Sequence, residues 1–169
     1  MIKVREGDYA YASGRIRAIE PKLFGPGHYD RMLEANNAEE AFRILTDYGY
    51  GYGGGSASGV FAFERLLTEE MKKTYALLVE IIPQAEVVKA FQRKHDYFNI
   101  KVLLKAEFSG AEPPPILSDT GTITKENLTR MIRERNYEGL TDLMVQTIEE
   151  VRDVFSRTQD PQAIDLLLD

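Results

Sequence analysis

Apolar residues recur at steps of three and four along most of the sequence, and this spacing restricts the fold more than any other feature. One stretch shows it well, with large apolar residues on a single helical face at Phe63, Leu67, Met71, Leu78 and Ile82. Leu66 and Tyr75 widen this face. Such spacing indicates amphipathic helices, whereas a half-buried strand needs alternating apolar and polar residues. Alternation is absent beyond a few residues, so we expect an all-α protein with no sheet.

Glycine, proline and asparagine divide this pattern into separate helices. Helices are expected over 8–20, 28–35, 38–45, 60–82, 85–108, 124–135 and 137–155, with a last one from Pro161. Asp8 is a suitable residue to cap the first helix. Asp160 and Pro161 combine a capping residue with proline at the first helical position, which is a strong start signal.

Charge and composition exclude several classes of function. The net charge of -6 repels phosphate backbones and anionic lipid, which disfavours nucleic acid and direct membrane docking. Cysteine is absent, so disulfides and thiolate metal sites are excluded and a cytoplasmic setting fits best. The charged first residues do not resemble a signal peptide, and no run approaches the roughly 20 apolar residues of a membrane span. We expect any membrane link to go through a partner.

Two pairs of segments match in the same order and indicate an internal duplication. The segment 8–18 aligns with 96–106 at an offset of 88 (96 minus 8), and both open with Asp-Tyr at an expected helix start. The segment 31–39 aligns with 130–138 at an offset of 99 (130 minus 31). The physical interpretation is helical units stacked side by side, each covering a face of the other.

The triple proline at 113–115 is the best candidate boundary between these units, since it favours a stiff, extended segment. We therefore predict a first helical unit with the start of the second signature helix over 1–110. The remainder of a second, incomplete unit follows over 111–169. The last residues stop inside an apolar pattern without a glycine cap, which is typical of a truncated sequence.

A glycine-rich loop at 49–59 contains the only apparent cofactor motif. Residues 49–54 read Gly-Tyr-Gly-Tyr-Gly-Gly and match G-x-G-x-x-G. A dinucleotide site needs that motif after a strand, whereas a helix is expected here, so we interpret the loop as a connector. His28 and His95 lack a further ligand at helical spacing, which disfavours a metal site. We predict no catalytic, cofactor-binding or metal-binding residues.

Two sets of residues are candidates for contact with a partner protein. The first is a basic stripe on the two matching helices, made of Arg15, Arg17, Lys101 and Lys105. It is either a solvated face or a docking stripe for an acidic partner. The second is the tyrosine group of the glycine-rich loop, made of Tyr48, Tyr50 and Tyr52. These tyrosines either form an interface, where tyrosine is favoured, or cover the ends of adjacent helices.

These segments resemble a known family. Residues 8–20 are similar to the opening helix of the C subunit of V-type (A-type) ATP synthases, and 93–106 resembles that family's most recognisable segment. The Ala-Glu-Glu-Ala helix leading to Gly49, Pro83, and the Asp160-Pro161 helix entry match as well. Members of that family are longer and contain a further helical unit, and the loop 49–59 is richer in glycine than the family pattern.

The resemblance implies a mechanical role without catalytic residues or cofactors. The C subunit of that family joins the central shaft, made of the D and F subunits, to the membrane ring of proteolipid subunits and turns with both. It implies a cytoplasmic protein held at the membrane through the complex. The sequence leaves open ATP synthesis or hydrolysis, proton or sodium transport, and the face that meets the shaft. A free-standing helical-repeat adaptor and a nucleotide enzyme using the glycine-rich loop are the alternatives.

Overall fold

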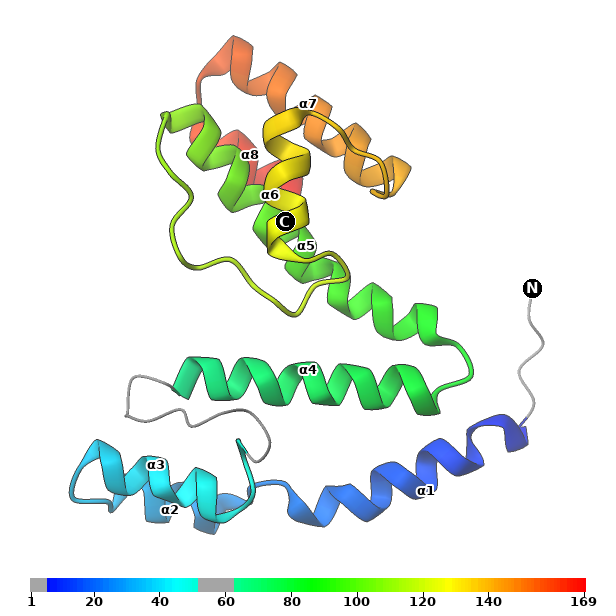
Figure 1. The fold of residues 1–169 in the computed structure, drawn as a ribbon, viewed down its shortest axis with the longest axis vertical. Coiled ribbons are helices and arrows are strands. Elements are labelled where there is room, and N and C mark those ends of the chain that lie inside the picture. The colour runs from blue at the N-terminus through cyan, green and yellow to red at the C-terminus, as the bar shows by residue number, and fades with distance from the viewer. Residues whose placement is uncertain (1–5, 52–62) are drawn as a thin grey trace. The chain divides into compact units, whose positions relative to one another are not determined.

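The computed structural model describes residues 6–51 and 63–169, and every regular element in these ranges is a helix (Figure 1). The all-α prediction is confirmed, and no strand occurs in the described residues. Two short 3-10 helices, Glu6–Tyr9 and Glu20–Lys22, flank the first α-helix. The α-helices are α1 (Ala10–Ile19), α2 (Pro26–Leu33), α3 (Ala38–Asp47), α4 (Phe63–Ile81), α5 (Ala85–Ser109), α6 (Lys125–Glu134), α7 (Asp142–Thr158) and α8 (Pro161–Leu168).

The contacts divide the chain into two compact units, unit 1 ending at Val88 and unit 2 starting at Lys89. This division lies inside α5 and differs from the predicted boundary at 110. The loop between α5 and α6, which contains the triple proline, returns along α5 and is bonded to it (Figure 1). It is therefore part of unit 2, and the duplication itself stays a prediction.

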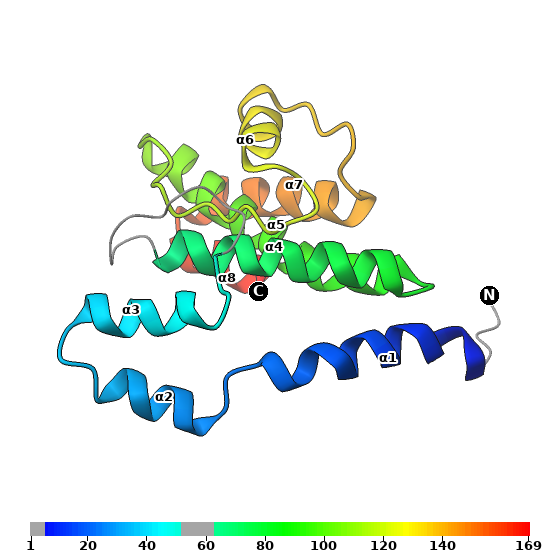
Figure 2. The ribbon, with the colours of Figure 1, turned by 60° about the horizontal axis from the view of Figure 1, so that its bottom comes forward.

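Unit 2 is built on a core to which all four of its helices contribute. Its buried apolar residues are Ile100, Leu103, Leu104, Leu128, Ile132, Met144, Ile148, Val151, Ile164 and Leu168. They recur at steps of three and four within each helix, as the sequence predicts. Phe108 and Phe155 stack at the edge of this core, with ring centroids 4.0 Å apart. Figure 2 shows α6 and α7 in a second view.

Local capping determines where the helices of unit 2 begin. The side chains of Thr124, Thr141 and Asp160 each accept a hydrogen bond from the first turn of the helix that follows. Asp160 and Pro161 therefore start α8 as predicted. The helix expected from 137 begins only at Asp142, because Gly139 has a left-handed φ of 97° that breaks the helical path.

Both predicted Asp-Tyr helix starts are wrong in detail. Helix α1 begins at Ala10, and its N-cap position is Tyr9, whose side chain makes no capping hydrogen bond. Asp96 lies in the middle of α5, which runs without a break from Ala85 to Ser109. The Asp-Tyr pair in α5 therefore has another role.

Unit 1 packs α1 against α4 and α2 against α3 (Figures 1 and 2). The buried residues of α4 are Leu66 and Ile81, whereas Phe63, Leu67 and Met71 are 45%, 47% and 44% exposed. These three residues lie on the apolar face that the periodicity identifies, and they form an exposed apolar stripe at four-residue steps. None of the helices described has an apolar stretch long enough to cross a bilayer.

Candidate functional site

The segment 93–106 contains a buried polar anchor, which we call the Asp96–Asn99 anchor. Asp96 and Asn99 are one helical turn apart on α5, and both are 0% exposed. The Asp96 carboxylate accepts hydrogen bonds from Thr122 N at 3.0 Å, Thr122 Oγ1 at 2.7 Å and Ile123 N at 3.1 Å. Three donors from one loop thus satisfy a carboxylate that water does not reach.

Asn99 fixes the same loop at a second point. Its Nδ2 donates to Ser118 O at 2.8 Å, and its Oδ1 accepts from Ser118 N at 2.7 Å. Gly121 passes so close that a Cβ atom there would overlap Asp96 Oδ1 and lie 3.0 Å from Asp96 Cγ. Only glycine fits this approach without a shift of the loop. The anchor therefore determines the path of the loop between α5 and α6.

A hydroxyl cluster lies beside the anchor and includes a histidine. Ser118 Oγ is 2.7 Å from Thr120 Oγ1 and 3.4 Å from His95 Nδ1. Burial lowers the pKa of His95, and the neighbouring Lys94 lowers it further. The Asp96 carboxylate is directed to Thr122 and the backbone beyond it, so the arrangement is that of a loop anchor. The sequence pattern predicts His95 beside a helix start, whereas it lies within α5.

Lys101 and Lys105, two of the predicted partner-contact residues, join α5 to α8. Lys105 Nζ lies 2.6 Å and 2.8 Å from the two carboxylate oxygens of Asp165. Lys101 pairs with Asp169 and lies 3.7 Å from Asp165. The hydrogen bond from Lys105 holds the pKa of Asp165 below its ordinary value. Within this chain, the two lysines stabilise the position of α8.

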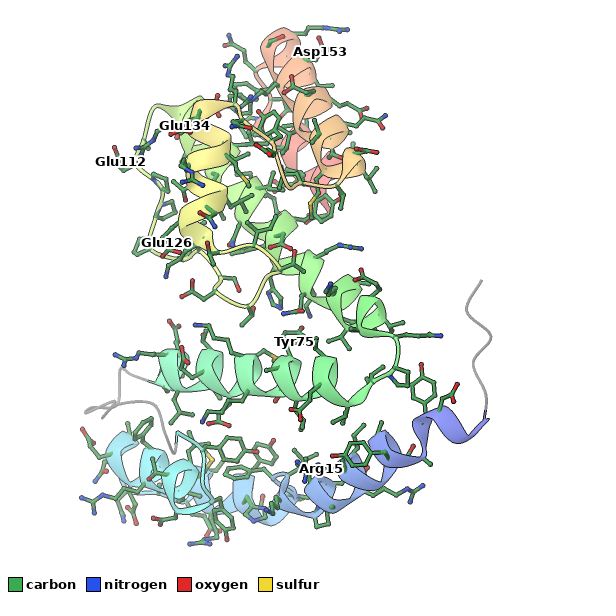
Figure 3. The ribbon with its side chains drawn as sticks, turned by 45° about the vertical axis from the view of Figure 1, so that its right-hand side comes forward. Arg15, Tyr75, Glu112, Glu126, Glu134 and Asp153 are labelled. Atoms are coloured by element: carbon green, nitrogen blue, oxygen red, sulfur yellow. The ribbon has the colours of Figure 1, made fainter. Side chains whose placement is uncertain are left out.

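Arg15 and Arg17 lie on α1 in unit 1, and both are exposed (Arg15 is labelled in Figure 3). The predicted basic stripe therefore has two different settings. Its α1 half faces solvent, and its α5 half binds carboxylates of the same chain. The role of the arginines in partner contact stays a prediction.

Tyr48 and Tyr50 belong to an aromatic cluster centred on Phe24. The Phe24 ring meets the Tyr48 and Tyr50 rings edge-on at 5.5 Å and 5.0 Å, and it stacks on His28 at 4.9 Å. Tyr48 Oη also accepts a hydrogen bond from Arg31 at 3.0 Å. Burial raises the pKa of Tyr50. These tyrosines join the end of α3 to the start of α2, while Tyr48 stays 43% exposed.

The apparent nucleotide motif lacks the setting that its chemistry needs. Helix α3 precedes the glycine-rich loop, whereas a dinucleotide site needs a strand there. Gly51 N donates to the Glu70 carboxylate at 2.9 Å, so this amide already has an acceptor. Tyr52 and the rest of the loop lie outside the described residues. Within the described residues, no three His, Asp or Glu side chains are grouped as a metal site requires.

Sequence reasoning missed the anchor, although a signal for it exists. Asp96 and Asn99 stand at a spacing of three on a helix face that otherwise carries apolar core residues. Polar residues on a buried face need hydrogen-bond partners. The hydroxyl-rich and glycine-containing segment 118–122 is the obvious supplier of such partners.

Comparison with known proteins gives one consistent match. The family described as ATP synthase (C/AC39) subunit matches residues 12–169. The chain is similar to the C subunit of the A-type ATP synthase of Methanocaldococcus jannaschii, with 32% identity over 152 residues, 85% of this chain and 35% of that protein. It is similar to the C subunit of the V-type sodium ATPase of Enterococcus hirae, with 27% identity over 164 residues, 96% of this chain and 49% of that protein.

The C subunit of the A-type ATP synthase of Methanococcoides burtonii is 24% identical over 150 residues, 83% of this chain and 42% of that protein. The chain thus spans between about a third and a half of the length of these relatives. No solved structure matches it significantly.

Proposed function

Because the chain belongs to the ATP synthase (C/AC39) subunit family, we propose that it is a non-catalytic coupling subunit of a rotary V/A-type ATPase. It would join the central shaft, made of D- and F-type subunits, to the membrane ring of proteolipid subunits. Its place would be the cytoplasmic side of the membrane, where the complex holds it.

The observation that carries this proposal is the use of the polar groups in the recognisable segment 93–106. Asp96 and Asn99 hold the loop between α5 and α6, and Lys101 and Lys105 hold α8. These groups tie the loop and α8 to α5, and this structural use supports the proposed mechanical role of the segment. A coupling subunit has to transmit force through such fixed contacts between its elements.

Unit 1 supplies surface for contact with other subunits. The α4 stripe of Phe63, Leu67 and Met71 exposes apolar side chains at successive helical turns. Exposed apolar groups of this kind are typical of surfaces that meet another protein. Arg15 and Arg17 add positive charge on α1 of the same unit. We assign the shaft or ring contact to these features together.

Co-purification tests the proposal. The chain is expressed with tagged D- and F-type shaft subunits and, separately, with the proteolipid ring, and the expected result is a stable complex with at least one of them. Leu67→Glu should weaken that complex, and Ala76→Glu, at an exposed position on the opposite face of the same helix, is the matched control. Absence of association with both shaft and ring would overturn the coupling role and favour a free-standing adaptor.

A second assay addresses the absence of catalysis. The purified chain alone should hydrolyse no ATP above a blank preparation, and isothermal calorimetry should detect no nucleotide binding. Binding that disappears on Gly51→Ala would instead support a nucleotide site in the glycine-rich loop.

A further inference from the structure

Methionine is the only sulfur-containing residue type of this chain, because cysteine is absent. Four of its five methionines lie in the described residues, and they differ widely in exposure. Met71 is 44% exposed, whereas Met144 is 1% exposed in the core of unit 2. Met32 and Met131 are half-buried. Met71 is therefore the most exposed methionine in the part of the chain that the structure describes.

Met71 belongs to the α4 stripe, four residues after Leu67 and eight after Phe63. Residues at four-residue steps share one face of a helix, so the three side chains follow each other along about 12 Å of α4. Each of them is exposed by nearly half. Because all three are apolar, a polar atom on the side chain of Met71 would interrupt the stripe.

The thioether of an exposed methionine is open to attack on peroxides. Its sulfur gives an electron pair to one oxygen of hydrogen peroxide, so that an S–O bond forms while the O–O bond breaks. The other oxygen takes the proton of the transferred oxygen and leaves as water. The sulfur is oxidised, the peroxide is reduced, and the product is methionine sulfoxide. Methionine sulfoxide reductases reverse this change, so the modification is suited to a switch.

A sulfoxide changes what the stripe can bind. The methionine thioether is flexible and polarizable, and it adapts to the surface of a partner. The sulfoxide oxygen is a hydrogen-bond acceptor, and its transfer into an apolar contact without a donor is unfavourable. Oxidation of Met71 alone is therefore sufficient to weaken a contact that the whole stripe makes.

We propose that Met71 is an oxidation site that regulates the α4 stripe, because peroxide converts its thioether to the sulfoxide and so weakens the contact with another subunit. The contact rests on the proposed function, whereas the selective oxidation of Met71 does not. A partner that covers the stripe also shields Met71, so the modification acts on the chain before it assembles.

Peptide mass spectrometry after brief treatment with hydrogen peroxide tests the selectivity. Cleavage after lysine and arginine places each methionine of the described residues in a separate peptide, over 32–43, 66–72, 131–133 and 136–152. In the folded chain, Met71 should form sulfoxide at least tenfold faster than Met144. In concentrated urea the two rates should agree within twofold. Equal rates in the folded chain would overturn the inference.

Retention on a hydrophobic column reports the stripe without any partner. Peroxide should lower the retention of the parent chain, and Met71→Leu, which keeps the stripe apolar, should remove that response. Met131→Leu is the matched control, since it removes a half-buried methionine of unit 2 and should leave the response intact. Unchanged retention of the oxidised parent chain, or an equal loss of response in both variants, would overturn the inference.

Binding to the shaft or ring subunits measures the consequence for assembly. The oxidised chain should bind at least tenfold more weakly than the reduced chain, and methionine sulfoxide reductase should restore its binding. Met71→Leu should bind normally after the same treatment with peroxide.

The outcomes separate this inference from the proposed function. If Leu67→Glu weakens the complex but oxidation of Met71 does not, the inference is wrong and the proposed function stands. If neither shaft nor ring binds the chain, the proposed function and the regulated contact both fail. The oxidation rates and the column retention then decide on the oxidation site alone.

Discussion

Replacing Asp96 by asparagine tests whether the buried anchor, rather than local sequence, holds the loop before α6. The Asp96 carboxylate uses both oxygens, one for Ile123 N and one for the amide and hydroxyl of Thr122. Asparagine has nearly the same shape but only one acceptor oxygen. Its amide group must therefore face at least one of these loop donors.

The expected loss of stability can be estimated from these contacts. A buried donor without an acceptor costs about 1–3 kcal/mol, and hydrogen bonds to a charged group are stronger than those to a neutral one. One orphaned donor and the weakening of the remaining bonds together give about 2–4 kcal/mol. This is a large part of the roughly 5–15 kcal/mol typical of a domain.

Native-state hydrogen exchange is the appropriate assay because the chain has two compact units. Exchange of the core amide of Ile148 reports the free energy of opening of unit 2, and the amides of Thr122 and Ile123 report the loop itself. Asp96→Asn should speed exchange at all three positions, most of all in the loop.

Asp119→Asn is the matched control, since it makes the same chemical change in the same loop. Asp119 pairs with Lys125 at 2.9 Å, and both side chains are about one-third exposed. Such a surface pair contributes about 0–1 kcal/mol. If Asp96→Asn destabilises unit 2 by no more than Asp119→Asn, the anchor does not hold the loop and the reasoning is refuted.

Three further predictions concern the same unit. Gly121→Ala should destabilise it by about 2–4 kcal/mol in urea unfolding, because the new methyl group would overlap Asp96 Oδ1. Asp165 has a lowered pKa, so its contribution to stability is present above pH 3.8 and is lost as the pH falls through the pKa in the folded state. NMR titration should show that Lys105→Met raises this pKa toward its ordinary value, while Lys101 still lowers it in part. His95 has a lowered pKa in the folded state, so below pH 6.5 the unfolded chain binds more protons than the folded chain. Unit 2 should therefore lose stability on acidification from about pH 7 to about pH 5.5. His95→Gln should remove that dependence of stability on pH.

Each of these predictions has a control in the chain. Gly14→Ala adds a methyl group in open space within α1 and should stabilise the chain by up to about 1 kcal/mol. Lys125→Met should leave the titration of Asp165 unchanged, because Lys125 pairs with Asp119. His28→Gln should leave the pH dependence of unit 2 unchanged, since His28 belongs to unit 1. An equal response of control and test variant would contradict the corresponding prediction.

Most helices could be predicted from the sequence because their signals are local. Helix α3 begins after Asn37, α6 after Thr124 and α8 after Asp160, and each of these residues caps the helix next to it. A capping hydrogen bond joins residues two or three positions apart, so it can form regardless of how the rest of the chain packs. The late start of α7 depends on the left-handed conformation of Gly139. Glycine permits this conformation but does not require it, so the sequence alone does not predict it.

The candidate site could be predicted only in part. The sequence identifies Lys101 and Lys105 as a charged pair on one helix face, but their carboxylate partners lie 68 and 60 positions away, at the end of the chain and on α8. The periodicity identifies Phe63, Leu67 and Met71 as one apolar face of α4, but it does not show that this part of the face is exposed. Periodicity shows that a helix has an apolar face, but packing decides which part of that face is covered.

The sequence alone therefore determined the all-α class, most helix boundaries and the family, because these depend on neighbouring residues and on recognisable segments. Only the tertiary structure decided what the Asp-Tyr pair in α5 does. Asp96 became a buried anchor because a loop some 26 residues further on supplies its three donors. A buried carboxylate is stable only where such donors meet it, and that meeting depends on the packing of the whole unit.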